Sequence, residues 1–347
     1  MSKESSLLER ALCGALLGTA VGDALGLPAE GLHPKRIRRL WNGEWRMRLI
    51  FGRGMLSDDT EHTFAVAQSL AEFPNDAALF QRALAARLRW WFLALPAGVG
   101  MATARACIKL WLGFSPGKSG VFSAGNGPAM RSAVIGVFFH EDAAKRREFV
   151  RASTRITHTD PKAAAAALAI AEAAAFGVKG GTNEEIISAI TELSEDSSWR
   201  AAMEQLRAHL AQSSSTTDFA AALGLTKGVS GYAFHTVPVA LYAWLRHRDD
   251  FAKALTSALD CGGDTDTVGA IVGALSGASL GPKAIPAEWC EHIVDRPLSV
   301  AKLVAAGQSL AASEKIPSLH WPARVLRNAL FLCIVLAHGF RRLLPPY

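Results

Sequence analysis

Apolar residues recur at helical spacing along most of the chain, and alanine is prominent among them. The clearest such stretches are residues 79–95, 162–176, 184–193 and 237–246. Side chains three and four positions apart share one face of an α-helix, so each stretch predicts a helix with a buried face. Long alternations of apolar and polar residues, which are typical of strands, are scarce. The pattern therefore predicts an all-α fold of ten or more helices.

Short segments rich in Pro, Gly and Ser interrupt the helical pattern. They lie at residues 28–31, 116–118, 125–128 and 212–217, and we predict loops there. No segment repeats at a fixed period, which argues against a solenoid. We expect residues 1–310 to form one compact helical domain and residues 311–347 to form an apolar and basic helical extension.

Two segments carry glycine at every fourth position. These glycines are Gly14, Gly18 and Gly22 near the N-terminus, and Gly269, Gly273, Gly277 and Gly281 near the other end. Glycine inside a helix costs about 1 kcal/mol relative to alanine, and close contact between backbones is the obvious compensation. Asp23 and Asp266 adjoin the two segments, which argues against a membrane pairing motif. We predict two closely packed core helices, which pack against other neighbours or against each other.

Two apolar runs could be mistaken for membrane or export signals. Residues 11–21 are bracketed by acidic and basic side chains, unlike the core of a signal peptide. Residues 329–337 are nine apolar positions, whereas a spanning helix needs about 20. Because Arg324 and Arg327 precede this run and Arg341 and Arg342 follow it, we expect a packed or surface-lying helix and no transmembrane segment.

The net charge and the cysteine content indicate which class of partner and which compartment to expect. The 37 Lys and Arg against 31 Asp and Glu give a net charge of +6, which favours anionic partners without choosing between nucleic acid, membrane and phosphates. The five cysteines are odd in number and are not spaced as a metal clip or redox pair. Reduced thiols and a cytoplasmic location are the simplest interpretation.

Two acidic clusters provide the sharpest chemical signal. They are Ser57-Asp58-Asp59-Thr60 and Gly262-Gly263-Asp264-Thr265-Asp266-Thr267, and each precedes an apolar helix. Either cluster alone could simply cap its helix, because acids in the first turn complement the helix dipole. Together, four aspartates with interleaved hydroxyls form a ligand set for a hard cation and favour magnesium or manganese over zinc.

Two further acids follow the first glycine segment. Asp23 could end its helix or bind backbone amides, and we favour such a structural role. Glu30 lies in a loop bounded by Pro28 and Gly31, where functional side chains concentrate, although a solvated loop acid is an equal alternative.

These motifs, in this order, resemble the ADP-ribosylglycohydrolase family, which includes the dinitrogenase reductase-activating glycohydrolases. They are Gly14-Ala15-Leu16-Leu17-Gly18 with Gly22-Asp23-Ala24-Leu25-Gly26, Glu30, Ser57-Asp58-Asp59-Thr60, Gly125-Asn126-Gly127-Pro128-Ala129-Met130-Arg131, Thr157-His158-Thr159-Asp160-Pro161, and Gly262-Gly263-Asp264-Thr265-Asp266-Thr267. The resemblance covers about residues 10–285 and implies an all-α domain whose central cleft holds two Mg²⁺ or Mn²⁺ ions and ADP-ribose.

The resemblance also implies roles for individual residues. Ser57, Asp58, Asp59 and Asp266 would hold one metal, and Asp264, Asp266 and Thr267 would hold the other. Glu30 would be the catalytic glutamate. Read directly, the loop of Gly125, Asn126 and Gly127 can expose backbone amides to a phosphate, with a hydroxyl from Ser123, although an ordinary turn is the alternative. His158 resembles the family histidine near the ribose or adenine, with a helix-start histidine that bonds locally as its alternative. Tyr232 could stack on adenine or be an ordinary buried aromatic. His62 fits a supporting or plain helix-face position.

One long stretch of the chain has no acidic residue, and this bears on which leaving group the protein can recognise. Residues 77–140 contain no Asp or Glu, whereas recognition of a guanidinium normally requires a carboxylate. Either an acid from elsewhere, such as Glu61, performs this task, or the linkage that is cut is not to arginine.

The sequence thus predicts a magnesium-dependent glycosidic hydrolase that releases ADP-ribose from a macromolecule, most simply a protein. A nucleic-acid target stays open, although no dedicated nucleic-acid motif is present. A binding protein that masks a partner such as an ADP-ribosyltransferase toxin is the main alternative. A phosphohydrolase lacks support, because no Gly-rich loop with Gly-Lys-Ser/Thr occurs.

Overall fold

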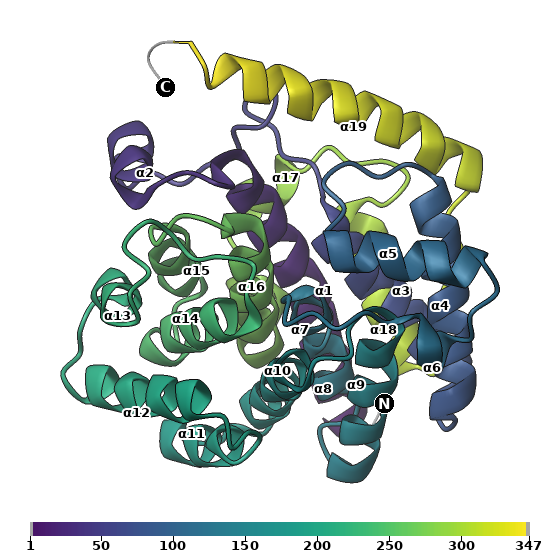
Figure 1. The fold of residues 1–347 in the computed structure, drawn as a ribbon, viewed down its shortest axis with the longest axis horizontal. Coiled ribbons are helices and arrows are strands. Elements are labelled where there is room, and N and C mark those ends of the chain that lie inside the picture. Colours follow the sequence, from purple (N-terminus) through teal and green to yellow (C-terminus); the bar gives the residue numbers. More distant parts are fainter. Residues whose placement is uncertain (1–2, 345–347) are drawn as a thin grey trace.

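The computed structural model describes residues 3–344, and within that range it contains 19 α-helices, two short 3-10 helices and no β-strand (Figure 1). The first half contains α1 (Lys3–Gly26), η1 (Leu27–Ala29), α2 (Pro34–Trp41), α3 (Asp58–Glu72), α4 (Ala77–Leu93), α5 (Met101–Trp111), α6 (Pro116–Ser119), α7 (Gly127–Met130), α8 (Ala133–Phe138), α9 (Ala143–Thr157) and α10 (Pro161–Lys179). The second half contains α11 (Asn183–Thr191), α12 (Ser197–Ala211), α13 (Thr216–Ala222), α14 (Ala233–Arg246), α15 (Phe251–Leu259), α16 (Thr265–Leu280), η2 (Pro282–Ala284), α17 (Ala287–Glu291), α18 (Val300–Ala311) and α19 (Trp321–Arg341). The all-α prediction is confirmed.

The four helices expected from the apolar spacing are α4, α10, α11 and α14, and side-chain caps fix the starts of the first three. The side chain of Asp76 accepts hydrogen bonds from the backbone of α4, and Thr182 and Glu185 form a capping box at α11. The loop predicted at residues 116–118 is wrong, because these residues form the short helix α6. Pro116 occupies its first turn, where the missing backbone N–H costs nothing.

Helices α1 and α16 pack against each other along the two rows of glycines. A Cβ atom built on Gly14 would lie 2.0 Å from the carbonyl oxygen of Gly277, and one on Gly18 would lie 2.0 Å from that of Gly273. The same contact continues at Gly22, whose added Cβ would lie 1.9 Å from the oxygen of Gly269. No side chain fits between these backbones, which is why glycine is needed. The predicted close packing is confirmed, and the two helices are each other's partners.

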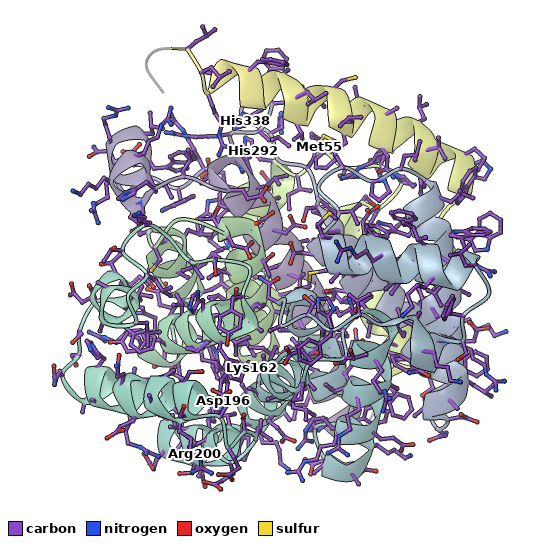
Figure 2. The ribbon with its side chains drawn as sticks, viewed as in Figure 1. Met55, Lys162, Asp196, Arg200, His292 and His338 are labelled. Carbon is purple, nitrogen blue, oxygen red and sulfur yellow. The ribbon has the colours of Figure 1, made fainter. Side chains whose placement is uncertain are left out.

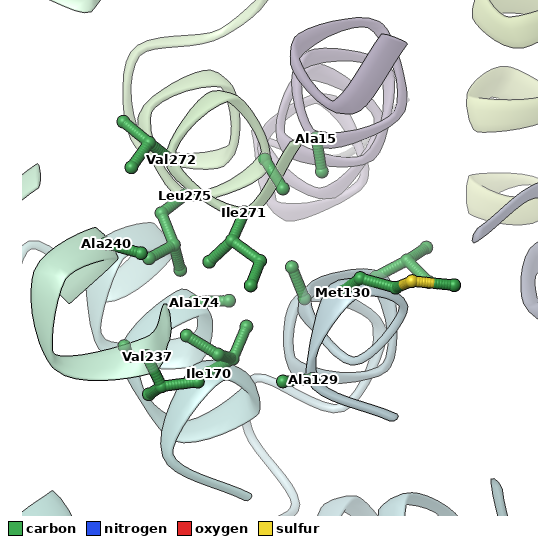
Figure 3. Close-up of a cluster of buried hydrophobic side chains, with 14 of the residues drawn as sticks. Ala15, Ala129, Met130, Ile170, Ala174, Val237, Ala240, Ile271, Val272 and Leu275 are labelled. Atoms are coloured by element: carbon green, nitrogen blue, oxygen red, sulfur yellow. The ribbon is translucent and has the colours of Figure 1, made fainter. Parts of the chain in front are cut away.

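The remaining core surrounds this helix pair. Ile271 and Leu275 of α16 face the alanine-rich helix α10 and the apolar side of α14 (Figure 3). Most of α10 is buried, and its small alanines let neighbouring helices approach closely. Gly136 of α8 illustrates this, because an added Cβ would lie 2.1 Å from the carbonyl oxygen of Ala171. One continuous hydrophobic core therefore extends from the N-terminal helix to α18.

Helix α19 lies across one end of the molecule, where it appears in yellow at the top of Figure 1. Met55 lies beneath it (Figure 2), and Phe331 of α19 packs with Met55, Leu27 and Leu49. The helix runs well beyond both ends of the predicted apolar run at residues 329–337. The domain boundary expected after residue 310 falls inside α18, near its end, and stays a prediction.

Three stretches are long and apolar enough to cross a membrane by length and composition alone. In the most apolar 18-residue windows of residues 5–29 and 161–179, 100% and 78% of the positions are buried within the protein, so these are core helices. The third, Trp321–Arg341, is only 22% buried. Its surface position agrees with the expectation of a packed or surface-lying helix.

Candidate functional site

The contact between α1 and α16 brings two loops of the site together. At the C-terminal end of α1, the hydroxyl of Thr265 donates to the carbonyl oxygen of Gly26 over 2.8 Å. The chain then continues through η1 to Glu30, and the next amide, that of Gly31, donates to the Gly263 oxygen over 2.7 Å. The loop that carries Glu30 is thereby hydrogen-bonded to the loop that carries Asp264 and Asp266.

Asp23 fixes the other acidic cluster. Its buried carboxylate accepts from the backbone amide of Ser57 over 2.9 Å and from the hydroxyl of Thr60 over 2.5 Å. The structural role predicted for Asp23 agrees with these contacts, although α1 continues three residues beyond it and does not end there. Asp23 therefore holds the first turn of α3, with Asp58 and Asp59, against α1.

A cavity of about 540 Å³ opens where these loops meet, within the size range of small-molecule sites. Ten of the predicted site residues line it. They are Glu30, Asp58, Ser123, Gly125, Asn126, Gly127, His158, Asp264, Asp266 and Thr267. Larger cavities of about 590 and 760 Å³ exist elsewhere, but neither gathers this chemistry.

The aspartates are crowded at the converging N-termini of α3 and α16. Burial, which keeps water from the carboxyl group, raises the pKa of Asp58 to about 8, and the charges of Asp23, Glu61 and Glu30 contribute smaller increases. Burial and the neighbouring carboxylates likewise raise the pKa values of Asp59 and Asp266 well above normal. These shifts mean that the carboxyl groups oppose one another's ionisation, so that all of them become ionised together only if positive charge lies beside them.

The donor set fits a hard divalent cation better than it fits an ion-free core. Oδ1 of Asp59 is buried without a hydrogen-bond partner, and Oδ2 accepts from the hydroxyls of Ser57 and Thr267 over 3.1 and 3.3 Å. An unsatisfied buried carboxylate oxygen is costly unless something positive meets it. Among the described residues no three His, Cys, Asp or Glu side chains form a metal-binding group by themselves. Ser57 and Thr267 place hydroxyl oxygens beside the carboxylate of Asp59.

Glu30 is exposed to the cavity at the end of η1. Its backbone oxygen accepts from the guanidinium of Arg342 over 2.7 Å, which ties the loop to the C-terminal end of α19. Loss of water and the charge of Asp264 raise the pKa of Glu30, while Arg342 acts in the opposite direction. A carboxylate with a raised pKa is a better proton acceptor in catalysis.

The glycine loop at residues 125–127 is shaped by His158. A Cβ on Gly125 would lie 2.9 Å from Nε2 of His158, and one on Gly127 would lie 3.2 Å from its Cε1. Glycine is needed here so that the imidazole can approach the loop. The side chain of Asn126 donates to Asp264 over 2.6 Å, which joins this loop to the acidic cluster. Because the backbone N–H of Asn126 already donates to Gly231, it does not serve as a phosphate donor.

His158 presents a hydrogen-bond donor to the cavity. The buried guanidinium of Arg131 donates to the hydroxyl oxygen of Thr157 over 2.8 Å, and this hydroxyl lies 2.9 Å from Nδ1 of His158. Because arginine only donates, the hydroxyl of Thr157 can donate its hydrogen to Nδ1, and on this ground we assign the Nε2–H tautomer to His158. The imidazole then carries its proton on Nε2, beside Gly125.

We expect His158 to remain neutral from pH 8 to pH 5. Burial, with a contribution from Arg131, lowers its pKa to about 3, whereas an unfolded histidine has the ordinary value of 6.5. The unfolded chain binds the proton more tightly, so this residue's contribution to the free energy of unfolding is complete above about pH 6.5 and is lost toward pH 3. Imidazole ¹⁵N shifts should report the Nε2–H tautomer, with His158→Gln identifying the signal. A titration midpoint between pH 6 and 7 would contradict this assignment.

Several candidate residues lie away from the cavity. Tyr232 does not line it, and its hydroxyl accepts from Lys162 over 3.2 Å. Glu61 is buried and accepts from the indole of Trp91 over 2.7 Å, so it is not aimed at a leaving group. His62 packs edge-on against Trp91, with ring centroids 4.3 Å apart, which fits its predicted supporting position.

Two lining segments were not predicted from the sequence. One is the start of α5 with its preceding loop, represented by Gly98, Gly100 and Thr103, and the other is Val229 to Gly231. The paired glycines of the first segment could have indicated a loop, but nothing in their pattern indicates a partner in space. The second segment is placed by the amide of Asp264, which donates to the Val229 oxygen over 2.8 Å.

Comparisons with known proteins agree with this site. Residues 4–316 match the family model of ADP-ribosylglycohydrolases. The chain is 29% identical to the ADP-ribosyl-[dinitrogen reductase] glycohydrolase of Rhodospirillum rubrum, over 83% of this chain and 91% of that one. It is 28% identical to the ADP-ribosylarginine hydrolase Tri1 of Pseudomonas putida, over 81% and 73% of the two chains.

A solved structure shares the fold as well. It is described as an ADP-ribosylglycohydrolase-related protein complex, and it superposes with a TM-score of 0.67 at 26% identity, covering 89% of this chain and 99% of the other. Both acidic clusters, the Glu30 loop and the glycine loop lie within the matched residues. The chain therefore belongs to the ADP-ribosylglycohydrolase family of hydrolases, which remove ADP-ribose from modified targets.

Proposed function

We propose that this protein hydrolyses the bond between the ribose anomeric carbon of ADP-ribose and a side chain of a target protein, assisted by two Mg²⁺ or Mn²⁺ ions. One observation carries the proposal. Glu30 and three crowded aspartates share a cavity of about 540 Å³ with the Gly125–Gly127 loop and His158. These residues would supply a proton acceptor, donors for an anionic ligand and part of a cation-binding set, whose other members, Ser57 and Asp59, are buried and do not line the cavity.

Ser57, Asp58, Asp59 and Asp266 would hold one ion, and Asp264, Asp266 and Thr267 would hold the other, with Asp266 shared. When bound, the ions would orient the ribose hydroxyls and make water more acidic. The orphaned Oδ1 of Asp59 and the raised pKa values of Asp58 and Asp266 support this assignment.

Glu30 would accept a proton from the attacking water as the water oxygen bonds to the anomeric carbon. The bond from that carbon to the target breaks, its electron pair stays on the departing atom, and the proton ends there. The transition state has oxocarbenium character, which the surrounding carboxylates favour.

The donors at the glycine loop would bind the remote part of the ligand. Nε2–H of His158 and the hydroxyl of Ser123 can donate to diphosphate or ribose oxygens. No acid occurs from residue 77 to 140, so this side of the cavity repels a diphosphate little. Contacts remote from the reacting bond align the anomeric carbon with Glu30.

The target is proposed to be a protein, because the relatives' names specify dinitrogen reductase and ADP-ribosylarginine as their substrates. The linkage in this chain is proposed to differ from arginine. The acids that line the cavity are Glu30, Asp58, Asp264 and Asp266, all engaged in the assignments above, and Glu61 is bonded to Trp91. A guanidinium leaving group would therefore lack a dedicated carboxylate.

The test presents the protein with serine-linked, ester-linked and arginine-linked ADP-ribose, and measures free ADP-ribose. We expect release in Mg²⁺ or Mn²⁺, with the arginine linkage cut more slowly, and loss of release in EDTA. The Asp266→Asn variant should lose most of the activity, since Asp266 is shared between both ions.

Three outcomes separate the parts of this proposal. No release from any substrate would contradict the hydrolase assignment, and full release after thorough chelation would contradict the metal assignment. A strong preference for the arginine linkage would leave both intact and show that one of the cavity carboxylates serves the guanidinium.

A further inference from the structure

The outward face of α19 is apolar over its whole length. Leu326 is 75% exposed, Leu330 58% and Phe340 69%, and the stripe continues past the helix to Leu343 and Leu344. These positions recur at helical spacing and form one face. A helix of 21 residues carries that face for about 31 Å. Monomeric proteins rarely expose a contiguous apolar face of this size to water.

Three polar side chains of α19, those of Arg327, Asn328 and His338, point the other way, into the protein. Arg327 is buried and pairs with Asp295, and it also donates to the carbonyl oxygen of Leu56. The side chain of Asn328 donates to the carbonyl oxygen of Ala94 over 2.9 Å. Nε2 of His338, which is labelled in Figure 2, lies 3.1 Å from the carbonyl oxygen of Pro28. Rolling the helix to hide its apolar side would break a buried ion pair. The same contacts argue against α19 leaving the protein to cross a membrane.

The charges around this face are almost all positive. The chain contains no Asp or Glu after Glu314. A cavity of about 590 Å³ at the C-terminal end of α19 is lined by Arg46, Arg48 and Arg341, with Glu288 as its acid. Phe51 lines the same cavity and is 98% exposed, which extends the apolar surface beyond the helix.

We propose that α19 docks on an anionic lipid bilayer, lying parallel to the membrane surface. Leu326, Leu330, Leu336 and Phe340 would enter the boundary between headgroups and acyl chains, and Phe51 would insert beside them. The arginines at the end of the helix would meet lipid phosphates. This is the energetic arrangement of interfacial helices, in which apolar burial and attraction to anionic lipid add.

The charge pattern favours a bilayer over a second copy of the chain. Two α19 helices packed face to face would bring together two helices that lack acids and are flanked mainly by arginines, and the like charges would repel. An anionic bilayer complements both the apolar stripe and the arginines. Self-association is therefore the alternative that the experiment must exclude.

The test uses the full chain in vesicle flotation, with phosphatidylcholine vesicles and with vesicles of phosphatidylcholine and phosphatidylglycerol in equal parts. We expect flotation with the anionic vesicles, weakened by high salt. The double variant Leu330→Glu/Leu336→Glu should reduce the bound fraction by about tenfold or more, because two inserted leucines become charged.

A matched control carries the same two charges at the opposite end of the molecule. Ala201 and Ala208 are exposed on α12, which lies far from α19 (Figure 1), so Ala201→Glu/Ala208→Glu should float like the parent protein. Circular dichroism and release of ADP-ribose would verify that both variants are folded.

Failure to float with anionic vesicles, or equal flotation of both double variants, would overturn the proposal. A third measurement, light scattering at a series of protein concentrations, gives the oligomeric state of the parent protein and of both variants. A dimer of the parent protein that Leu330→Glu/Leu336→Glu abolishes would also overturn it, and would identify α19 as an interface between copies of this chain.

Discussion

The Glu30→Gln variant should turn over about 10²–10⁴-fold more slowly than the parent protein and should still bind ADP-ribose. Glutamine keeps the size of the side chain but cannot accept the proton of the attacking water. The backbone at this position is held by Arg342 and by the adjacent Gly31–Gly263 hydrogen bond, so the loop itself should not move. Single-turnover rates would measure the chemical step, and calorimetry with ADP-ribose would measure binding.

A second acid in the same part of the chain provides the control. Glu44 is exposed and does not line the cavity, so Glu44→Gln should leave both quantities unchanged. Parental turnover in Glu30→Gln would show that the proton acceptor is another group. Loss of ADP-ribose binding together with turnover would show that Glu30 acts through substrate binding.

The Gly18→Ala variant should lower the free energy of unfolding by about 3 kcal/mol or more, which is at or above the usual cost of overpacking. The added methyl carbon would lie 2.0 Å from the backbone oxygen of Gly273, so α1 and α16 must separate. Alanine's better helix propensity returns only about 1 kcal/mol. Urea denaturation followed by circular dichroism would give the difference.

Gly339→Ala is the matched control, because Gly339 also lies within a helix but an added Cβ there meets no atom within 4 Å. This variant should be as stable as the parent protein or more stable by up to about 1 kcal/mol. If Gly18→Ala unfolded at the parental urea concentration, the backbone contact between α1 and α16 would not be what stabilises this pair.

The sequence was sufficient for the fold class because the helical signal is local. Alanine-rich periodic stretches predicted α4, α10, α11 and α14 within a few residues. The glycine rows predicted close contact, but their spacing left the partner open, since any smooth helix surface could fill such a groove. Only the tertiary structure shows that the two rows face each other.

The C-terminal helix shows a different limit. The expected run at residues 329–337 was short because Arg327, Asn328 and His338 interrupt the apolar pattern. Such interruptions normally indicate the solvated face of a helix. In α19 they form the buried face, each with a partner in the protein, and the apolar residues lie outside.

The site was predicted best where residues adjoin in sequence. The two acidic clusters and the Glu30 loop are short motifs, and the structure brings residues of all three to one cavity. Tyr232 and Glu61 could not be placed from sequence, because the direction of each side chain depends on a distant partner, Lys162 for one and Trp91 for the other. The metal and substrate roles assigned to these residues stay predictions.

The glycine contact between α1 and α16 also divides the cavity into a fixed part and a part that can adjust. Any shift of the α1 backbone relative to α16, which begins beside Asp264 and Asp266, would require two backbones in direct contact to slide past each other. Entry of a ligand therefore leaves this wall in place. Adjustment falls to the lining residues outside it, such as the segment from Gly98 to Thr103, where Gly98 and Gly100 have open space around them.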